Sequence, residues 1–130
     1  MEPIRIAAAL IDDGAGNMLL VRKRDSGIYI QAGGKIERGE TPVDALRREL
    51  AEEIGLTFDV EPAYLGRFSA SAAHEAGRMV EAELFHLTTS HQPTAAAEID
   101  EARWIRIDQA AELDLAPMTR QHVLPIALAL

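Results

Sequence analysis

The segment that decides the fold lies in the first half of the chain, where residues 33–56 have the sequence GGKIERGETPVDALRRELAEEIGL. Its second part predicts a helix over 42–54, because Thr41 suits the N-cap, Pro42 the first helical position and Gly55 a C-terminal stop. Four apolar residues recur at helical spacing and form one stripe: Val43, Leu46, Leu50 and Ile54. The first eight residues, with three glycines, predict a loop that runs directly into this helix.

The predicted helix carries three glutamates on one flank, beside the apolar stripe. Glu49, Glu52 and Glu53 are spaced i, i+3 and i+4, so they project from the same side. They lie at the C-terminal end, where the helix dipole disfavours anions, and like charges at this spacing destabilise a helix by about 0.2–0.5 kcal/mol. A hard divalent cation would remove this penalty, since Mg²⁺ binds carboxylate oxygens. A solvated acidic face is the alternative.

The segment 33–40 favours the cation. Glycines let the backbone approach a ligand or ion closely, and a backbone carbonyl can serve as a metal ligand. A glycine-rich loop, an acid at its end and an acidic helix together form a more specific signal than any one of them. The sequence therefore predicts a metal site where this loop meets the helix.

The composition excludes several other classes of protein. Twenty-one Asp and Glu outnumber 13 Lys and Arg, and the formal net charge of −8 repels duplex nucleic acid. The absence of cysteine excludes disulfides, thiol catalysis and thiolate metal sites. No apolar run approaches the length of a membrane span, and the N-terminus Met1-Glu2-Pro3 lacks the positive charge of a signal peptide. We therefore expect a cytoplasmic protein with no membrane partner.

The length of 130 residues fits a single domain, 1–130. Turn signals at Asp13-Gly14 and Gly16-Asn17 predict a hairpin between the first two strands. Asp108 is expected to cap a short helix through Leu113, and Pro125 to kink or break a weak helix over 118–130. Strands are predicted over 4–11, 18–23, 63–70, 79–88 and 102–107, with a short extended piece at 28–30. This irregular mixture indicates an α+β fold with a mixed sheet.

The segment 34–56 resembles the Nudix box. The matching positions are Gly34, then Glu40 after five residues, then Arg48-Glu49-Leu50 after seven, followed by Ala51, Glu52-Glu53, Ile54 and Gly55-Leu56. The resemblance implies the Nudix fold, an α/β/α sandwich with a central mixed β-sheet flanked by helices. It also implies Mg²⁺- or Mn²⁺-dependent hydrolysis of the pyrophosphate linkage in a nucleoside diphosphate linked to X. The variable positions of the box are most similar to the MutT-like subgroup, which favours a nucleoside triphosphate or a related nucleotide.

The resemblance also assigns roles to individual residues. Glu49, Glu52 and Glu53 would be the metal-site carboxylates, and Gly34 would add its backbone carbonyl. Arg48 would orient the glutamates. The resulting catalytic set is Arg48, Glu49 and Glu53. Glu49 is the first choice for the general base, although other family members place the base in a loop.

Further candidates lie outside the helix. Glu98, with Glu101 as the alternative, would be an extra metal ligand ahead of Trp104. Substrate contacts are expected from Arg22, Lys23, Gly33 and Lys35. The residues Gln31-Ala32 stand where the family usually has Leu-Pro, which puts the geometry of the glycine loop in question.

The sequence leaves three alternative functions. A nucleotide-binding or regulatory Nudix module without efficient catalysis is disfavoured by the intact box. A hydrolase of a nucleotide sugar or ADP-ribose is a second alternative. An acidic structural domain would leave the glycines and glutamates unexplained. The expected partner is a small nucleotide, and the resemblance is compatible with a homodimer.

Overall fold

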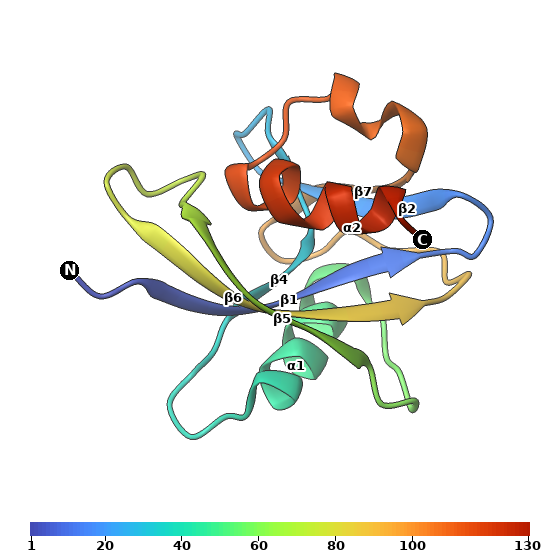
Figure 1. The fold of residues 1–130 in the computed structure, drawn as a ribbon. Helices are drawn as coiled ribbons and strands as arrows, with labels where there is room; N and C mark the ends of the chain where they lie inside the picture. Colours follow the sequence, from blue (N-terminus) through green and yellow to red (C-terminus); the bar gives the residue numbers. More distant parts are fainter.

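The fold is built on one mixed seven-stranded sheet with helices on both faces (Figure 1). The computed structural model describes all of residues 1–130. In chain order the strands are β1 (Ile4–Asp12), β2 (Asn17–Lys23), β3 (Tyr29–Ile30), β4 (Ala32–Lys35), β5 (Ala63–Ser71), β6 (Met79–Thr88) and β7 (Ile99–Arg106). The main path is β3-β2-β1-β6-β5, with β4 paired to β1 and β7 paired to β2. Only β1 and β6 are parallel.

The side chains of β1 alternate between two hydrophobic cores. Its buried odd-numbered residues pack with Leu46 and Leu50 of α1 (Pro42–Ile54) on one face of the sheet. The even-numbered ones pack with Met118 and Val123 of the C-terminal helical segment on the other face. Figure 1 shows α1 and the C-terminal helices on opposite sides of the strands. The predicted α/β/α sandwich around a central mixed sheet is therefore confirmed.

The first two predicted strands form, but they separate soon after their turn. β1 and β2 pair only at Asp12 with Met18. From there β2 pairs with β7, while the same edge of β1 pairs with β4, where Ala7 lies opposite Gly34. The divergence opens a space between β1 and β2 into which β4 inserts. β5 and β6 pair antiparallel along their lengths.

Two boundaries differ from the prediction. Residues 33–35 are part of strand β4 rather than a loop, because their backbone pairs with β1. β7 begins at Ile99 rather than at residue 102, so Glu98 directly precedes a strand of the sheet. The first difference places Gly33, Gly34 and Lys35 on the sheet, and the second places Glu98 directly beside it.

The expectation that Asp108 caps a helix is wrong. The segment Ile107–Glu112 is a 3-10 helix (η1) that begins after Arg106 and has no side-chain cap. The Asp108 carboxylate instead accepts two hydrogen bonds from the Arg106 guanidinium. An ion pair with the neighbouring strand end has taken the place of the cap.

Pro125 does not break the C-terminal helix. A π-helical turn (η2, Thr119–Val123) leads without interruption into α2 (Leu124–Leu128). The wider turn gives room for the proline, which lacks an N–H and whose ring would collide with the carbonyl one α-helical turn before it. None of the helices combines the length and the apolar character needed to cross a membrane.

Candidate active site

Helix α1 begins and ends where local sequence signals place it. The Thr41 hydroxyl accepts a hydrogen bond from the Asp44 N–H, and the Asp44 carboxylate accepts one from the Thr41 N–H. Gly55 ends the helix in the left-handed conformation, with φ of 66°. This capping box and glycine stop fix the two ends of the helix. Its apolar stripe packs on the sheet, which leaves Glu49 and Glu53 beside β4.

Both glycines of β4 make close contacts that leave no free space for a side chain. At Gly33, φ is 143°, and a Cβ would lie 2.2 Å from the carbonyl oxygen of Ala7 and 2.7 Å from Cα of Ala8. At Gly34, a Cβ would lie 2.3 Å from Cδ of Glu49 and within 2.6 Å of both its carboxylate oxygens. The absence of side chains lets β4 lie between β1 and the carboxylates of α1.

Arg48 ties the glycine segment to the helix. Its Nε and Nη2 donate to the two carboxylate oxygens of Glu40 at 2.8 and 2.9 Å. Nη1 donates to Oε1 of Glu49 at 2.7 Å, and Nη2 also donates to the carbonyl of Lys35 at 3.0 Å. Hydrogen bonds from Arg48, and then from the Glu37 N–H, lower the pKa of Glu40 to about 2. Arg48 thus has the orienting position that the resemblance implies.

Glu53 is the most deeply buried carboxyl group of the site. The residue is 7% exposed, and its Oε1 accepts a hydrogen bond of 3.1 Å from the Gly33 N–H. Burial raises the pKa of Glu53 to about 8, and the charge of Glu49 acts in the same direction, against the Gly33 hydrogen bond. The Gly33 hydrogen bond offsets only part of the cost of burying the charged carboxylate. A cation beside Glu53 would therefore stabilise its ionised form.

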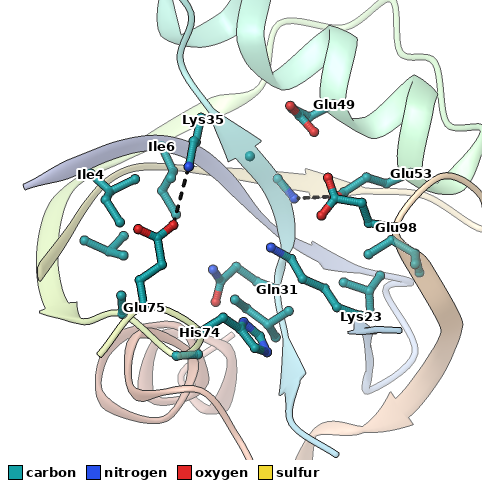
Figure 2. A pocket seen from close by; sticks show the side chains of 18 of the residues that line it. Ile4, Ile6, Lys23, Gln31, Lys35, Glu49, Glu53, His74, Glu75 and Glu98 are labelled. Carbon is teal, nitrogen blue, oxygen red and sulfur yellow. Dashed lines mark hydrogen bonds and ion pairs between the residues drawn. The ribbon is translucent and has the colours of Figure 1, made fainter. Parts of the chain in front are cut away.

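A cavity of about 410 Å³ lies where these elements meet. Figure 2 shows Glu49, Glu53 and Glu98 at one end, with the Lys23 amine directed toward Glu53. The predicted site residues that line it are Lys23, Gly33, Gly34, Lys35, Glu49, Glu53 and Glu98. Lys35 also forms an ion pair of 3.4 Å with Glu75 across the cavity mouth. Seven predicted residues from four parts of the chain therefore share one cavity.

Three other predicted residues lie outside the cavity. Arg48 supports it from behind, as described above. The Glu52 side chain is 55% exposed, with an ion pair of 3.8 Å to Arg48. Arg22 donates to Asp100 at 2.8 Å and to the Ser26 carbonyl at 2.9 Å. Arg22 and Lys23 are consecutive on β2, and only the latter reaches the cavity, so the structure does not support Arg22 as a substrate contact.

The structure separates the two candidates for an extra metal ligand. Glu98 lines the cavity, immediately before β7. The Glu101 carboxylate instead accepts a hydrogen bond from the Tyr29 hydroxyl and lies 3.7 Å from Arg103. We therefore retain Glu98 as the candidate.

Several cavity residues were missed by sequence reasoning. Gln31 lines the middle of the cavity, and the apolar side chains of Ile4, Ile6 and Val80 form one wall. The only sequence signal for Gln31 was its departure from the family pattern. His74 also lines the cavity, and its Nε2 lies 3.0 Å from Oγ of Ser26.

The donors at the acidic end fit a hard divalent cation. Carboxylates and a backbone carbonyl are the oxygen ligands that Mg²⁺ and Mn²⁺ prefer. The Glu49 carboxylate lies against Gly34, and the buried Glu53 carboxylate accepts a hydrogen bond from the Gly33 N–H, so both carboxylates lie beside β4. The side chains do not form a closed cluster of three acidic ligands in this structure. A cation bound here would draw Glu49 and Glu53 together.

Comparison with known proteins agrees with this geometry. The NUDIX domain family model matches residues 2–125. The chain is 32% identical to the CTP pyrophosphohydrolase of Escherichia coli (strain K12) over 121 residues, which cover 90% of this chain and 86% of the relative. It is 40% identical to the 8-oxo-dGTP diphosphatase of Haemophilus influenzae over 57 residues, or 41% of this chain and 42% of that protein.

Among solved structures, the chain is similar to the solution structure of the E. coli ORF135 protein. The TM-score is 0.77 at 30% sequence identity, and the match covers 99% of this chain and 91% of the other. The family model spans nearly the whole chain, and the matches to the CTP pyrophosphohydrolase and to the ORF135 structure cover most of those two proteins. The chain therefore belongs to the Nudix hydrolase family.

Proposed function

We propose that the chain is a metal-dependent pyrophosphohydrolase that cleaves a nucleoside triphosphate or a related nucleotide. The observation that carries this proposal is the placement of Glu49 and Glu53 against the two glycines of β4, at the acidic end of a nucleotide-sized cavity. The similarity to an enzyme named CTP pyrophosphohydrolase supports a triphosphate and makes CTP the first substrate to test.

The cofactor that fits the site is Mg²⁺ or Mn²⁺. The residues that would hold it are Gly34 through its carbonyl, Glu49, Glu52, Glu53 and Glu98. Bound metal supplies charge neutralisation to the phosphates and lowers the pKa of a bound water. Glu52 is mostly exposed, so we assign it a peripheral place in this set.

The remaining residues of the cavity have roles in binding and proton transfer. Lys23 and Lys35 would contact phosphate oxygens, whereas the predicted contact from Gly33 is not retained because its N–H is donated to Glu53. Glu49 would take the proton of the attacking water as an anhydride P–O bond breaks. Glu75 is a loop carboxylate that also lines the cavity, and it is the alternative base.

The test is release of pyrophosphate or phosphate from a panel of nucleotides with Mg²⁺ and with Mn²⁺. We expect turnover by the wild type and a fall of about 100-fold or more in Glu49→Gln and Glu53→Gln, because each variant loses a metal-site charge. Glu112→Gln, an exposed glutamate in η1, is the matched control. Comparing Glu49→Gln with Glu75→Gln identifies the base.

If the chain is instead a nucleotide-binding module without catalysis, it would bind nucleotide and metal but hydrolyse no nucleotide of the panel with either Mg²⁺ or Mn²⁺. Turnover of ADP-ribose or a nucleotide sugar in preference to triphosphates would favour the other alternative. A cytoplasmic location and a homodimer remain predictions from the sequence.

A further inference from the structure

Gln31 is a buried amide whose orientation is fixed from behind. The residue lies between β3 and β4, is 3% exposed and lines the cavity. Its backbone N–H donates to Oγ1 of Thr119 at 3.3 Å, and the Thr119 hydroxyl donates to Oε1 of Gln31 at 2.5 Å. Thr119 belongs to η2 and is fully buried.

The side-chain nitrogen of Gln31 has no hydrogen-bond acceptor within the protein. The Thr119 hydroxyl accepts the backbone N–H of Gln31 and donates its single proton to the amide oxygen. The amide nitrogen therefore keeps two protons for another acceptor. It makes no hydrogen bond within the protein, and it is not sealed from the cavity. Figure 2 shows the amide end of Gln31 directed into the cavity.

The surroundings of this amide fit the base of a nucleotide rather than its phosphates. Figure 2 shows Glu49, Glu53 and Glu98 together at one end of the cavity, with the Lys23 amine between them and Gln31. Away from that end the lining includes the apolar side chains of Ile4, Ile6 and Val80, and the Lys35–Glu75 ion pair lies beside Ile4 and Ile6 (Figure 2). Pockets that bind small molecules specifically usually combine an apolar lining with a few fixed polar groups. A flat nucleobase could pack on the apolar side chains while its edge accepts a hydrogen bond from Gln31.

We propose that Gln31, held by Thr119, is a specificity-determining residue that donates a hydrogen bond to a carbonyl oxygen of the nucleobase. This inference rests on the proposed function and narrows its substrate class to nucleotides with a keto group on the base. Cytosine, uracil and guanine carry an exocyclic oxygen that projects from the ring. Adenine carries none, and its amino group would meet the amide protons of Gln31.

The test compares kcat/KM for CTP, UTP, GTP and ATP. We expect the wild type to prefer at least one keto nucleotide over ATP. Gln31→Glu keeps an oxygen for the Thr119 hydroxyl but removes the donor, and Gln31→Met removes both. Each should reduce that preference by about tenfold or more, mainly through KM, because the carbonyl loses its donor on binding.

Thr119 is a positioning residue and gives a second, independent test. Thr119→Val keeps the shape but loses the hydroxyl, so we expect the keto preference to fall. Thr119→Ser keeps the hydroxyl and should retain the preference. Melting temperatures of all four variants would show that each remains folded. An equal loss of activity on all four nucleotides in the Gln31 variants, or no change in preference, would overturn the inference.

Binding separates this inference from the proposed function. Calorimetric titration with CMP, UMP, GMP and AMP in the presence of Mg²⁺ needs no turnover. Failure of the wild type to hydrolyse any nucleotide would refute the proposed function, whereas tighter binding of a keto monophosphate than of AMP, lost in Gln31→Glu, would still support the role of Gln31. Equal binding of all four monophosphates would refute it.

Discussion

Gly34 and Glu49 are in such close contact that the glycine hydrogen faces the carboxylate directly. A Cβ at position 34 would lie 2.3 Å from Cδ of Glu49. The contact joins the strand that carries a predicted metal-binding carbonyl to the helix that carries the predicted base. Since the Glu49 carboxylate is the far end of a flexible side chain, it can move away from an added methyl group while the backbone stays in place.

Gly34→Ala should therefore impair activity more than stability. We expect the displaced Glu49 to lower kcat by about 100-fold, the effect of moving a catalytic group by an ångström or so. The melting temperature should change little. Steady-state kinetics and thermal unfolding of the same preparation would check this. A large loss of stability would show that the Glu49 carboxylate cannot move away from the added methyl group.

Gly33→Ala should have the opposite outcome, and it is the natural comparison. The added Cβ would meet the backbone of β1, 2.2 Å from the Ala7 carbonyl oxygen, and φ of 143° is unfavourable for alanine. Neither the strand backbone nor this torsion can relax cheaply, so we expect the free energy of unfolding to fall by more than about 1 kcal/mol. Urea denaturation would measure it. A wild-type midpoint would contradict the register of β4 with β1.

Arg48→Lys should reduce activity although the charge is kept. A lysine cannot bond both oxygens of Glu40 and also reach Glu49 and the Lys35 carbonyl, so the carboxylate and the end of β4 lose their common anchor. We expect kcat to fall about tenfold or more. The control is Arg47→Lys on the same helix, whose arginine contacts Phe58 and not the cavity. Equal activity of the two variants would remove Arg48 from the site.

Asp12 should make stability depend on pH in the acidic range. Burial raises its pKa, but hydrogen bonds from His86, Thr88 and the Gly14 N–H outweigh burial and leave the pKa below the ordinary value of 3.8. The folded protein thus binds this proton less readily than the unfolded chain. The stabilisation is complete above pH 3.8 and is lost as the pH falls through the lowered pKa.

We therefore expect Asp12→Asn to unfold at lower temperature than the wild type near pH 6. The difference should shrink as the pH is lowered below 3.8. Melting curves across this range would measure it, with Asp59→Asn, at an exposed position in the segment between α1 and β5, as the control. A difference that is constant with pH would mean that the carboxylate charge is not what stabilises this corner of the sheet.

Local signals explain which elements could be predicted. The limits of α1 follow from Thr41, Asp44 and Gly55, which act within one turn of the helix ends. The Asp108 cap does not form because Arg106, two residues earlier at the end of β7, binds the same carboxylate. The helix does not break at Pro125 because a π-helical turn precedes α2 and gives room for the proline.

The site shows the same division. The spacing of Glu49, Glu52 and Glu53 placed all three on one flank of a helix, but spacing cannot tell which of them reaches a cavity. Glu53 is buried because β4 covers it, whereas Glu52 remains exposed one residue before it. Arg22 and Lys23 differ in the same way, because the pairing of β2 decides which side chain faces inward.

By itself, the sequence determined the helix 42–54, its acidic flank, the α+β class and the family resemblance, because caps, helical periodicity and a fixed-spacing motif are local properties of the chain. Only the tertiary structure decided that Gly33 and Gly34 form a strand, since a partner in β1 must be present to accept them. It also joined Gln31 to Thr119, 88 residues away. Such long-range contacts depend on strand order and register, which no local pattern encodes.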